Sequence, residues 1–326
     1  MARGIRRCVA ALILAFAGMA DANAQPAYPD KPVKIVVGFP PGGGLDVLIR
    51  GVAQELGNKW GKPVVVDNRP GASSLIAAEA VAKSPPDGYT LLAVTDQIYL
   101  ANRFVFKALP YDPDKSFASV IQLARTGQFM IAHPSLAASN LKELIALAKT
   151  KPGSINYGHW GEGAPPHLVY ETMNKSLGTT FVGIPYKGVA PVLQALVANE
   201  IQLSVGSSGV AGPLLKAGKV KALAFASTAR HAEFADVSTT AEQGAPKLQA
   251  SIWFGIAAPA GTPADIVGRL NADMAEVLRT PAFVQRFVAG IGWSVVGGSP
   301  ADMDATIGRE LPLIRDMIAN AGVRPQ

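Results

Sequence analysis

A glycine-rich loop between Phe39 and Leu45 has the residue types of an anion-binding site. It reads FPPGGGL, and it lies between the apolar run Val33–Phe39 and a helical pattern. Glycines let backbone N–H groups approach a ligand closely, and a helix N-terminus favours negative charge. The loop has neither the Lys-Ser/Thr of a P-loop nor the spacing GxGxxG, so phosphate or dinucleotide is not favoured. The alternative is a tight turn without a ligand. The candidate contacts are Phe39, Pro41, Gly42, Gly43 and Leu45.

A second loop, YGHWGEGAPPHL from Tyr157 to Leu168, also leads from a strand pattern into a helix pattern. Three of its side chains, His159, Glu162 and His167, are of types that ligate metals. Their spacing matches no strong zinc pattern such as HExxH, and no further ligand cluster is evident, so we expect no metal. Trp160 is either the wall of an apolar pocket or a packing residue. The candidate contacts of this loop are Gly158, His159, Trp160, Gly161, Gly163 and His167.

A third loop, VGSSGVAG from Val205 to Gly212, contributes hydroxyl groups. Ser207 and Ser208 either donate to an anion or cap the helix that follows. The loop is not the G-x-S-x-G of a nucleophile elbow. A hydrolase would also need an acid–histidine partnership, which four histidines in the chain do not establish. We therefore expect no catalytic residue, no enzymatic activity and no cofactor.

Polar residues also follow the strand pattern that ends near Val94, in the segment TDQIYLANR. Thr95 and Gln97 are candidate ligand contacts. Asp96 would repel an anion, so we expect it to point away from the site. Asp46 and Arg50, at positions i and i+4 of a helix pattern, are expected to form a surface or hinge salt bridge.

The elements that must position these loops follow an alternating order. Between residues 33 and 94 the pattern is β-α-β-α-β, which predicts a parallel sheet covered by helices on both faces. A second series of strands and helices begins near residue 126, and three helical patterns opened by Pro263, Pro281 and Pro300 close the chain. The fold class is therefore α/β with two lobes, residues 25–125 with 249–326 and residues 126–248. In such sheets, ligands bind at the carboxyl ends of the strands.

The N-terminal residues 1–24 have the order of a secretory signal peptide. A basic region with Arg3, Arg6 and Arg7 precedes the apolar run Val9–Ala17, and Ala22-Asn23-Ala24 is a small-residue cleavage signal before Gln25. The only cysteine, Cys8, lies within the leader, so we expect no disulfide in the mature chain. The formal net charge of +6 is spread along the chain without a basic run interleaved with aromatics, so we expect no nucleic-acid partner.

Longer stretches resemble the periplasmic solute receptors called Bug receptors, the TctC family of tripartite tricarboxylate transporters. They span nearly the whole mature chain in order: YPDKPVKIVVGFPPGGGLDVLIR, VVVDNRPGASSLIAAEAVAKSPPDGYTLL, LPYDP, HPSLAASNLKELIALAK, IPYKGVAPVLQALVANEIQL, AGKVKALA and WFGIAAPAGTP. The resemblance implies a type II periplasmic binding protein, a Venus flytrap whose lobes are each a sheet flanked by helices. It also implies a monomer in the periplasm that passes its ligand to membrane permease subunits. The alternatives are a sensor co-receptor for a two-component system and, less favoured, a periplasmic enzyme acting on an organic acid.

In this family the ligand carboxylate is gripped by two loops, through backbone N–H groups and ordered waters. The matching positions are Phe39 to Gly44 and Gly158 to Gly163 with the helix start that follows. Gly43 is then the position where backbone meets carboxylate and where a positive φ is expected.

Three departures from the family pattern bear on the ligand. Leu45 stands where a threonine is common, and the second loop carries His159, Trp160 and Glu162 in place of small residues. Gly206-Ser207-Ser208 replaces a stretch that often supplies an acidic side chain, which weakens the case for an amino-acid ligand. Leu45 and Trp160 suggest an apolar wall, so the sequence predicts an aromatic or aliphatic carboxylate.

Overall fold

A computed structural model of the chain describes residues 28–160, 163–186, 189–227, 229–248, 250–289 and 292–325. The expected signal peptide, its cleavage point before Gln25 and the candidate Gly161 lie outside these residues.

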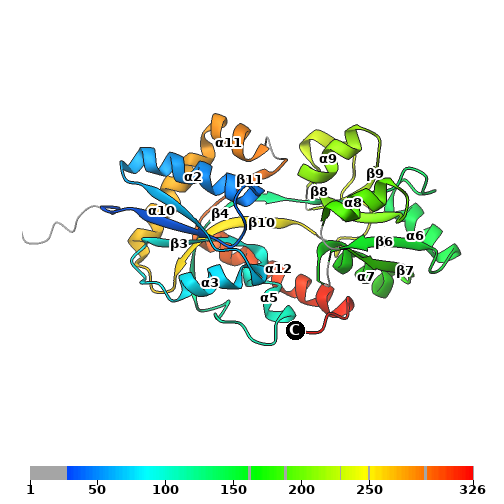
Figure 1. Cartoon of the computed structure of the whole chain (residues 1–326), viewed down its shortest axis with the longest axis horizontal. Helices are drawn as coiled ribbons and strands as arrows, with labels where there is room; N and C mark the ends of the chain where they lie inside the picture. Colours follow the sequence, from blue (N-terminus) through cyan, green and yellow to red (C-terminus); the bar gives the residue numbers. More distant parts are fainter. Residues whose placement is uncertain are drawn as a thin grey trace, which may run out of the picture.

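The first lobe contains a six-stranded mixed sheet in the order β11-β4-β10-β3-β1-β2 (Figure 1). β1 pairs in parallel with both β2 and β3, as the alternating pattern predicts. β10 pairs antiparallel with β3 and β4, and β11 antiparallel with β4, so only one side of this sheet is parallel. The strands are β1 (Val33–Val37), β2 (Val64–Asn68), β3 (Thr90–Thr95), β4 (Phe117–Thr126), β10 (Ile252–Pro259) and β11 (Ser294–Gly297).

The second lobe contains a five-stranded sheet in the order β7-β6-β8-β5-β9. β6 is parallel to β7 and β8, whereas β5 is antiparallel to β8 and β9. The strands are β5 (Gln128–Ala132), β6 (Ile155–His159), β7 (Phe181–Pro185), β8 (Leu203–Ser207) and β9 (Lys221–Ala226).

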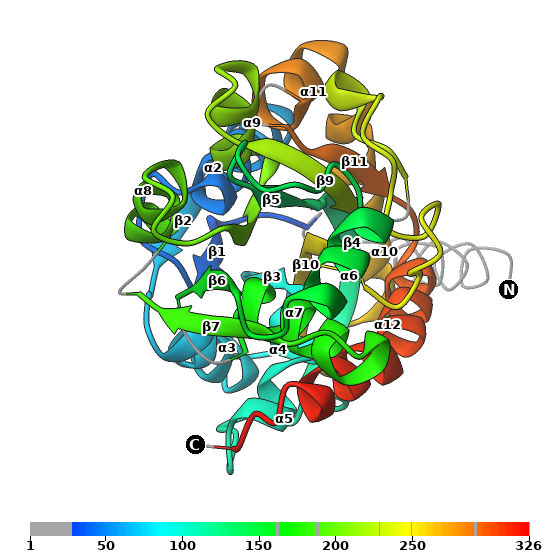
Figure 2. The same cartoon turned by 90° about the vertical axis from the view of Figure 1, so that its right-hand side faces the viewer.

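Helices cover both faces of both sheets, and Figure 2 shows α8 and α9 on one side of the second sheet with α6 and α7 on the other. The second-lobe helices are α6 (Leu141–Thr150), α7 (Pro165–Leu177), α8 (Val189–Val197) and α9 (Ser208–Lys216). The remaining helices are α2 (Gly44–Trp60), α3 (Leu75–Ala82), α4 (Asp96–Tyr99), α5 (Asn102–Val105), α10 (Ala264–Arg279), α11 (Pro281–Phe287) and α12 (Pro300–Asn320), with short 3₁₀ turns at Ala72–Ser74 and Ala232–Phe234. The three helices predicted to open at a proline are confirmed, with Pro263 as the N-cap of α10.

The first sheet is covered on both faces around β1, which lies one strand in from its edge and whose successive side chains point to opposite sides. Ile35 packs in a cluster with residues of α2, α10 and α11, and Val36 packs in another with residues of α3 and the start of α12. Both side chains are almost completely inaccessible to solvent. This is why β1 appears in the sequence as a continuous apolar run rather than an alternating one.

The lobes are joined by strands and by the last helix. The chain passes from the first sheet to the second at Gly127, between β4 and β5, and it returns between β9 and β10. Helix α12 spans both lobes, since Met303 near its start packs in the first lobe and Met317 near its end packs in the second. Pro312 lies inside this helix. The lobe boundaries at residues 126 and 248 stay a prediction. The structure adds that α12 passes from the first lobe into the second.

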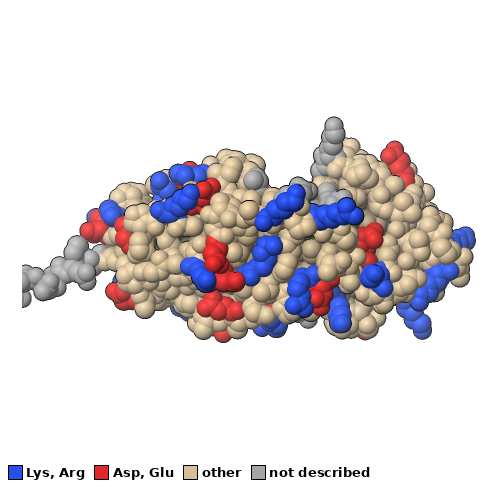
Figure 3. Space-filling model, turned by 90° about the horizontal axis from the view of Figure 1, so that it is seen from below, with Lys and Arg blue, Asp and Glu red and all other residues tan. Residues whose placement is uncertain are grey.

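The surface of the described residues is mixed in charge. On the face shown in Figure 3, Lys and Arg are interspersed with Asp and Glu rather than gathered in a continuous field of one sign. Within the described ranges, no helix combines the length and the apolar character needed to cross a bilayer.

The crossing between the lobes requires glycine at position 127. A Cβ added there would lie 2.3 Å from Cζ of Phe225 and 2.7 Å from Cβ of Ser227. Phe225 is only 4% exposed, so it has little room to move. We expect Gly127→Ala to lower the free energy of unfolding by about 1–3 kcal/mol, as overpacking does.

Gly268, inside α10, is the matched control because a Cβ there meets nothing within 4 Å. Gly268→Ala should stabilise the protein by up to about 1 kcal/mol through helix propensity. Urea unfolding of both variants measures the difference, and a Gly127→Ala protein as stable as wild type would contradict the packing argument.

Candidate functional site

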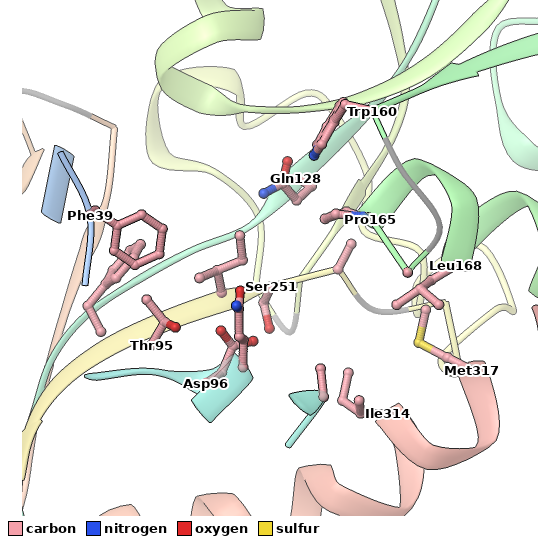
Figure 4. Close-up of a pocket in the computed structure, with 16 residues that line it drawn as sticks. Phe39, Thr95, Asp96, Gln128, Trp160, Pro165, Leu168, Ser251, Ile314 and Met317 are labelled. Carbon is pink, nitrogen blue, oxygen red and sulfur yellow. The ribbon is translucent and has the colours of Figure 1, made fainter. Parts of the chain in front are cut away.

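A pocket of about 320 Å³ lies between the lobes, and both lobes line it (Figure 4). Phe39 follows β1, Thr95 ends β3, and Trp160 directly follows β6. The pocket therefore lies at the carboxyl ends of parallel strands, where α/β sheets bind ligands. Its described lining residues are Phe39, Thr95, Asp96, Gln97, Ala101, Gln128, Trp160, Gly163, Pro165, Leu168, Ala250, Ser251, Ile252, Phe254, Ile314 and Met317.

Five of the residues predicted from the sequence are brought together in this lining: Phe39, Thr95, Gln97, Trp160 and Gly163. Trp160 has both of the roles considered for it, since it also packs against the second-lobe cluster that contains Phe129. Gln97 donates from Nε2 to the carbonyl oxygen of Ser73 over 2.9 Å, which ties α4 to the 3₁₀ turn beside it.

Other candidates lie outside the described lining. Pro41, Gly42 and Gly43 are exposed in the loop that follows Phe39, whereas Leu45 is 5% exposed and packs in the core beneath α2. The positive φ expected at Gly43 is found at Gly42 instead (+84°), and Gly43 has an ordinary extended φ of −73°. That expectation is wrong because the turn is made one residue earlier.

The first loop is held by a buried carboxylate. Oδ2 of Asp46 accepts from the N–H of Gly42 at 2.9 Å and from Nε of Arg50 at 2.8 Å, and Oδ1 accepts from Nδ2 of Asn68 at 2.8 Å. Nδ2 of Asn68 also donates to the carbonyl oxygen of Phe39 at 3.0 Å. The Asp46–Arg50 pair is thus more than the expected surface salt bridge, because it fixes the loop that borders the pocket.

The second loop is tied to the helix that follows it. Nδ1 of His167 accepts from the N–H of Gly163 at 3.2 Å, and the ring centroids of His159 and His167 are 5.2 Å apart. Gly158 lies against the side chains of Ile201 and Val192, which leave no space for a Cβ at this position. Among the described residues, no group of three His, Cys, Asp or Glu is arranged to hold a metal ion.

The third loop lies at a different contact between the lobes. Oγ of Ser208 donates to the carbonyl oxygen of Gly292 at 2.6 Å, and Nε2 of His231 lies 3.2 Å from the same oxygen. Ser207 is the N-cap of α9, but its side chain makes no capping hydrogen bond. Ser208 borders a separate cavity with His231 and Trp293 rather than the pocket of Figure 4.

The sequence did not predict the polar residues Asp96, Gln128 and Ser251 in the lining, or the network behind Ser251. Asp96 lines the pocket, so the expectation that it points away is wrong. Nη1 of Arg125 donates to Oγ of Ser251 at 2.9 Å, and Nη2 donates to Oε1 of Glu310 at 2.7 Å. Oε2 of Glu310 accepts from Nε1 of Trp253 at 3.0 Å. No local motif indicates this network, because Arg125 and Glu310 are 185 residues apart.

Burial raises the pKa of Asp96 to about 7, and the negative charge of Glu310 adds to this effect. The backbone N–H of Gln97 and the charge of Arg125 act in the opposite direction. Beside Asp96, the hydroxyl of Thr95 is buried and has no hydrogen-bond partner in the part of the chain that the structure describes.

Comparison with known proteins decides the family. The model of the tripartite tricarboxylate transporter family receptor matches residues 48–322. This chain belongs to that family. Among its relatives, BugT of Bordetella pertussis is 34% identical over 282 residues, which is 86% of each chain.

Solved receptors of the family share the whole fold. A protein of R. palustris, solved with adipate, is 34% identical with a TM-score of 0.77, covering 92% of this chain and 100% of its own. MatC of Rhodopseudomonas palustris, solved with bound malate, is 30% identical with a TM-score of 0.72, covering 89% of this chain and 100% of its own. These structures confirm the two-lobed α/β fold expected for a Bug or TctC receptor.

The Asp46 network gives a test of how the first loop is held. Burial alone would raise the pKa of Asp46, but the hydrogen bonds from Arg50, Gly42 and Asn68 outweigh it and hold the pKa below its usual value. In Asp46→Asn, one carboxylate oxygen is replaced by an NH₂ group. Both oxygens of Asp46 accept hydrogen bonds, so in either orientation of the amide this NH₂ group faces a donor. We expect a loss of about 1–3 kcal/mol in the free energy of unfolding at neutral pH.

Because the folded-state pKa is lowered, this stability is fully present above the unfolded-state pKa and is lost as pH falls through the folded-state value. The difference between wild type and Asp46→Asn in denaturant unfolding should therefore shrink below about pH 4. Asp114→Asn, which breaks an exposed pair with Arg103, is the control and should cost less than about 1 kcal/mol. A constant difference down to low pH would contradict the assignment.

Proposed function

We propose that this protein is a periplasmic receptor that captures a small organic carboxylate between its lobes and delivers it to the membrane permease subunits of a tripartite transporter. The observation that carries the proposal is the pocket itself, which is lined from both lobes at the carboxyl ends of β1, β3 and β6. Membership of the receptor family and the adipate and malate of two related structures support the ligand class.

The carboxylate is gripped by the loops at Phe39 to Gly44 and at Gly158 to Gly163. Each loop leads into the N-terminus of a long helix, α2 or α7, where the first N–H groups have no partner within the helix. Since Gly42 donates to Asp46, the donors offered by the first loop are those of Gly43 and the residues after it. Water between these donors and the ligand completes the contact at little enthalpic cost.

The walls of the pocket favour a ligand with an apolar body. Phe39 and Trp160 face the space from opposite lobes, and Leu168 and Met317 extend the apolar surface toward α12 (Figure 4). A ligand that contacts both lobes stabilises the closed arrangement, because only that arrangement offers both sets of contacts. We propose that the receptor acts as a monomer, because both lobes of a single chain contribute described residues to the pocket.

A screen of organic acids by thermal unfolding tests the function, because a ligand bound only by the folded state raises the unfolding temperature. The variant Gly43→Val locates the site. A Cβ at Gly43 meets only the carbonyl oxygen of Pro40, at 3.7 Å, so the protein should fold normally. The valine side chain blocks approach to the loop, and we expect carboxylate affinity to fall at least about tenfold.

Gly308→Val, in the interior of α12 where a Cβ meets nothing within 4 Å, is the matched control and should bind like wild type. Calorimetric titration with the acid found in the screen compares the three proteins. A well-folded Gly43→Val that binds like wild type would show that the loop is only a turn.

Export is tested separately. We expect the mature protein to begin at Gln25, because the basic region, apolar run and small-residue signal end there. Mass spectrometry of the protein from a periplasmic extract measures this, and an intact Met1 terminus in that extract would contradict it.

A further inference from the structure

Among the described residues, the lining of the ligand pocket has one charged side chain, and it is negative. Among the described residues that line the pocket there is no Lys, Arg or His, and the only acid is Asp96. Asp96 begins α4 directly after β3 and remains partly exposed, and Figure 4 shows it among the residues that surround the space. A pocket that binds only a carboxylate has no need of such a group, because like charges repel.

The charges behind the pocket do not neutralise Asp96. The charges that act on it are those of Glu310 on α12, which raises its pKa, and Arg125 on β4, which lowers it. Arg125 is bound to Glu310 at 2.7 Å and to Ser251 at 2.9 Å, so these two opposite charges cancel each other. No described cation forms a salt bridge with Asp96, and Arg125 acts on it only from a distance. An unpaired carboxylate in an apolar site is unfavourable unless it is protonated or meets a positive charge.

Two other features of the pocket suit a positive charge. Phe39, Trp160 and Phe254 line it, and the faces of aromatic rings attract cations. Thr95 is 4% exposed, and its hydroxyl has no partner in the described part of the chain. Buried hydroxyls are nearly always hydrogen-bonded, so this one points to a polar ligand group beside Asp96.

We propose that the ligand carries a protonated nitrogen in addition to its carboxylate, and that Asp96 binds this nitrogen with help from the hydroxyl of Thr95. The inference rests on the proposed function, which assigns the carboxylate to the glycine-rich loops. It also revises an expectation from the sequence. The acidic side chain missing from Gly206-Ser207-Ser208 is supplied by the loop after β3, so an amino acid or other amino-carboxylate is the favoured class of ligand.

Two sets of probes with matched chain lengths separate the contribution of the nitrogen from that of the carboxylate. The first is 6-aminohexanoate, hexanoate and adipate, and the second is 4-aminobutyrate, butyrate and succinate. Each set keeps one carboxylate and places an ammonium, a methyl or a second carboxylate at the other end. At about pH 8, where Asp96 is ionised, we expect the amino-carboxylate of at least one set to bind at least about tenfold tighter than its partners.

Asp96→Asn tests the residue itself, because it keeps the size of the side chain and removes its charge. We expect the preference for the amino-carboxylate to disappear and the dicarboxylate to bind more tightly. Asp316→Asn makes the same change of charge at an exposed position that is paired with Arg315, and it should leave the preference intact. Thermal unfolding of each variant shows whether it is folded.

The pH dependence gives a readout that a merely structural role would not produce. The affinity for the amino-carboxylate should fall between about pH 8 and pH 6 as Asp96 is protonated, and this fall should be absent in Asp96→Asn. If in both sets the monocarboxylate or the dicarboxylate binds more tightly than the amino-carboxylate at pH 8, the inference is overturned while the carboxylate receptor stands. The inference is likewise overturned if the screen of organic acids finds only ligands without a basic nitrogen. If neither these probes nor the screen gives a ligand, the proposed function fails, and the inference fails with it.

Discussion

The arrangement of the site depends on how tightly the backbone is packed where the lobes join. β4 continues into β5 with only Gly127 between them, and β10 returns along β4 with two shifts in register. At Gly255 on β10, an added Cβ would lie 2.6 Å from the carbonyl oxygen of Ile121. Gly255 thus lets β10 lie closer to β4 than ordinary residues allow, and Gly127 makes room for the side chain of Phe225 on β9. The residues at this crossing therefore hold fixed positions at the base of the pocket.

Polar residues that line the pocket, and the network behind them, come from that crossing. Arg125 lies at the end of β4, Gln128 begins β5, and Ser251 precedes β10. Glu310 reaches the same place from α12 and joins Arg125 to Trp253. The network thus connects three segments that are far apart in the sequence. It holds an ion pair whose net charge is zero behind a pocket in which Asp96 is the one charged residue among those described.

Local patterns predicted most of the elements but only part of the site. The alternation of apolar runs and helical patterns predicted β1 and β3 because these internal strands are buried and are therefore almost continuously apolar. It also predicted β2, although β2 is a partly exposed edge strand. Phe39, Thr95 and Trp160 could be found because residues that end strands in this fold class border the ligand. Asp96 was misjudged because its place in the pocket lining depends on how the two lobes come together, which no spacing in the sequence reveals. The buried role of Asp46 was also missed. An Asp and an Arg at positions i and i+4 look the same in the sequence whether they form a surface salt bridge or hold a loop in place.

Helix α12 has a mechanical consequence. Its first turns are fixed in one lobe and its last turns in the other, while Ile314 contacts both clusters. Pro312 lies just before that point, and a proline inside a helix removes one backbone hydrogen bond and favours a bend. Because its two ends are packed in different lobes, any movement of one lobe relative to the other must either bend this helix or detach one end. Pro312 is the position where bending costs least.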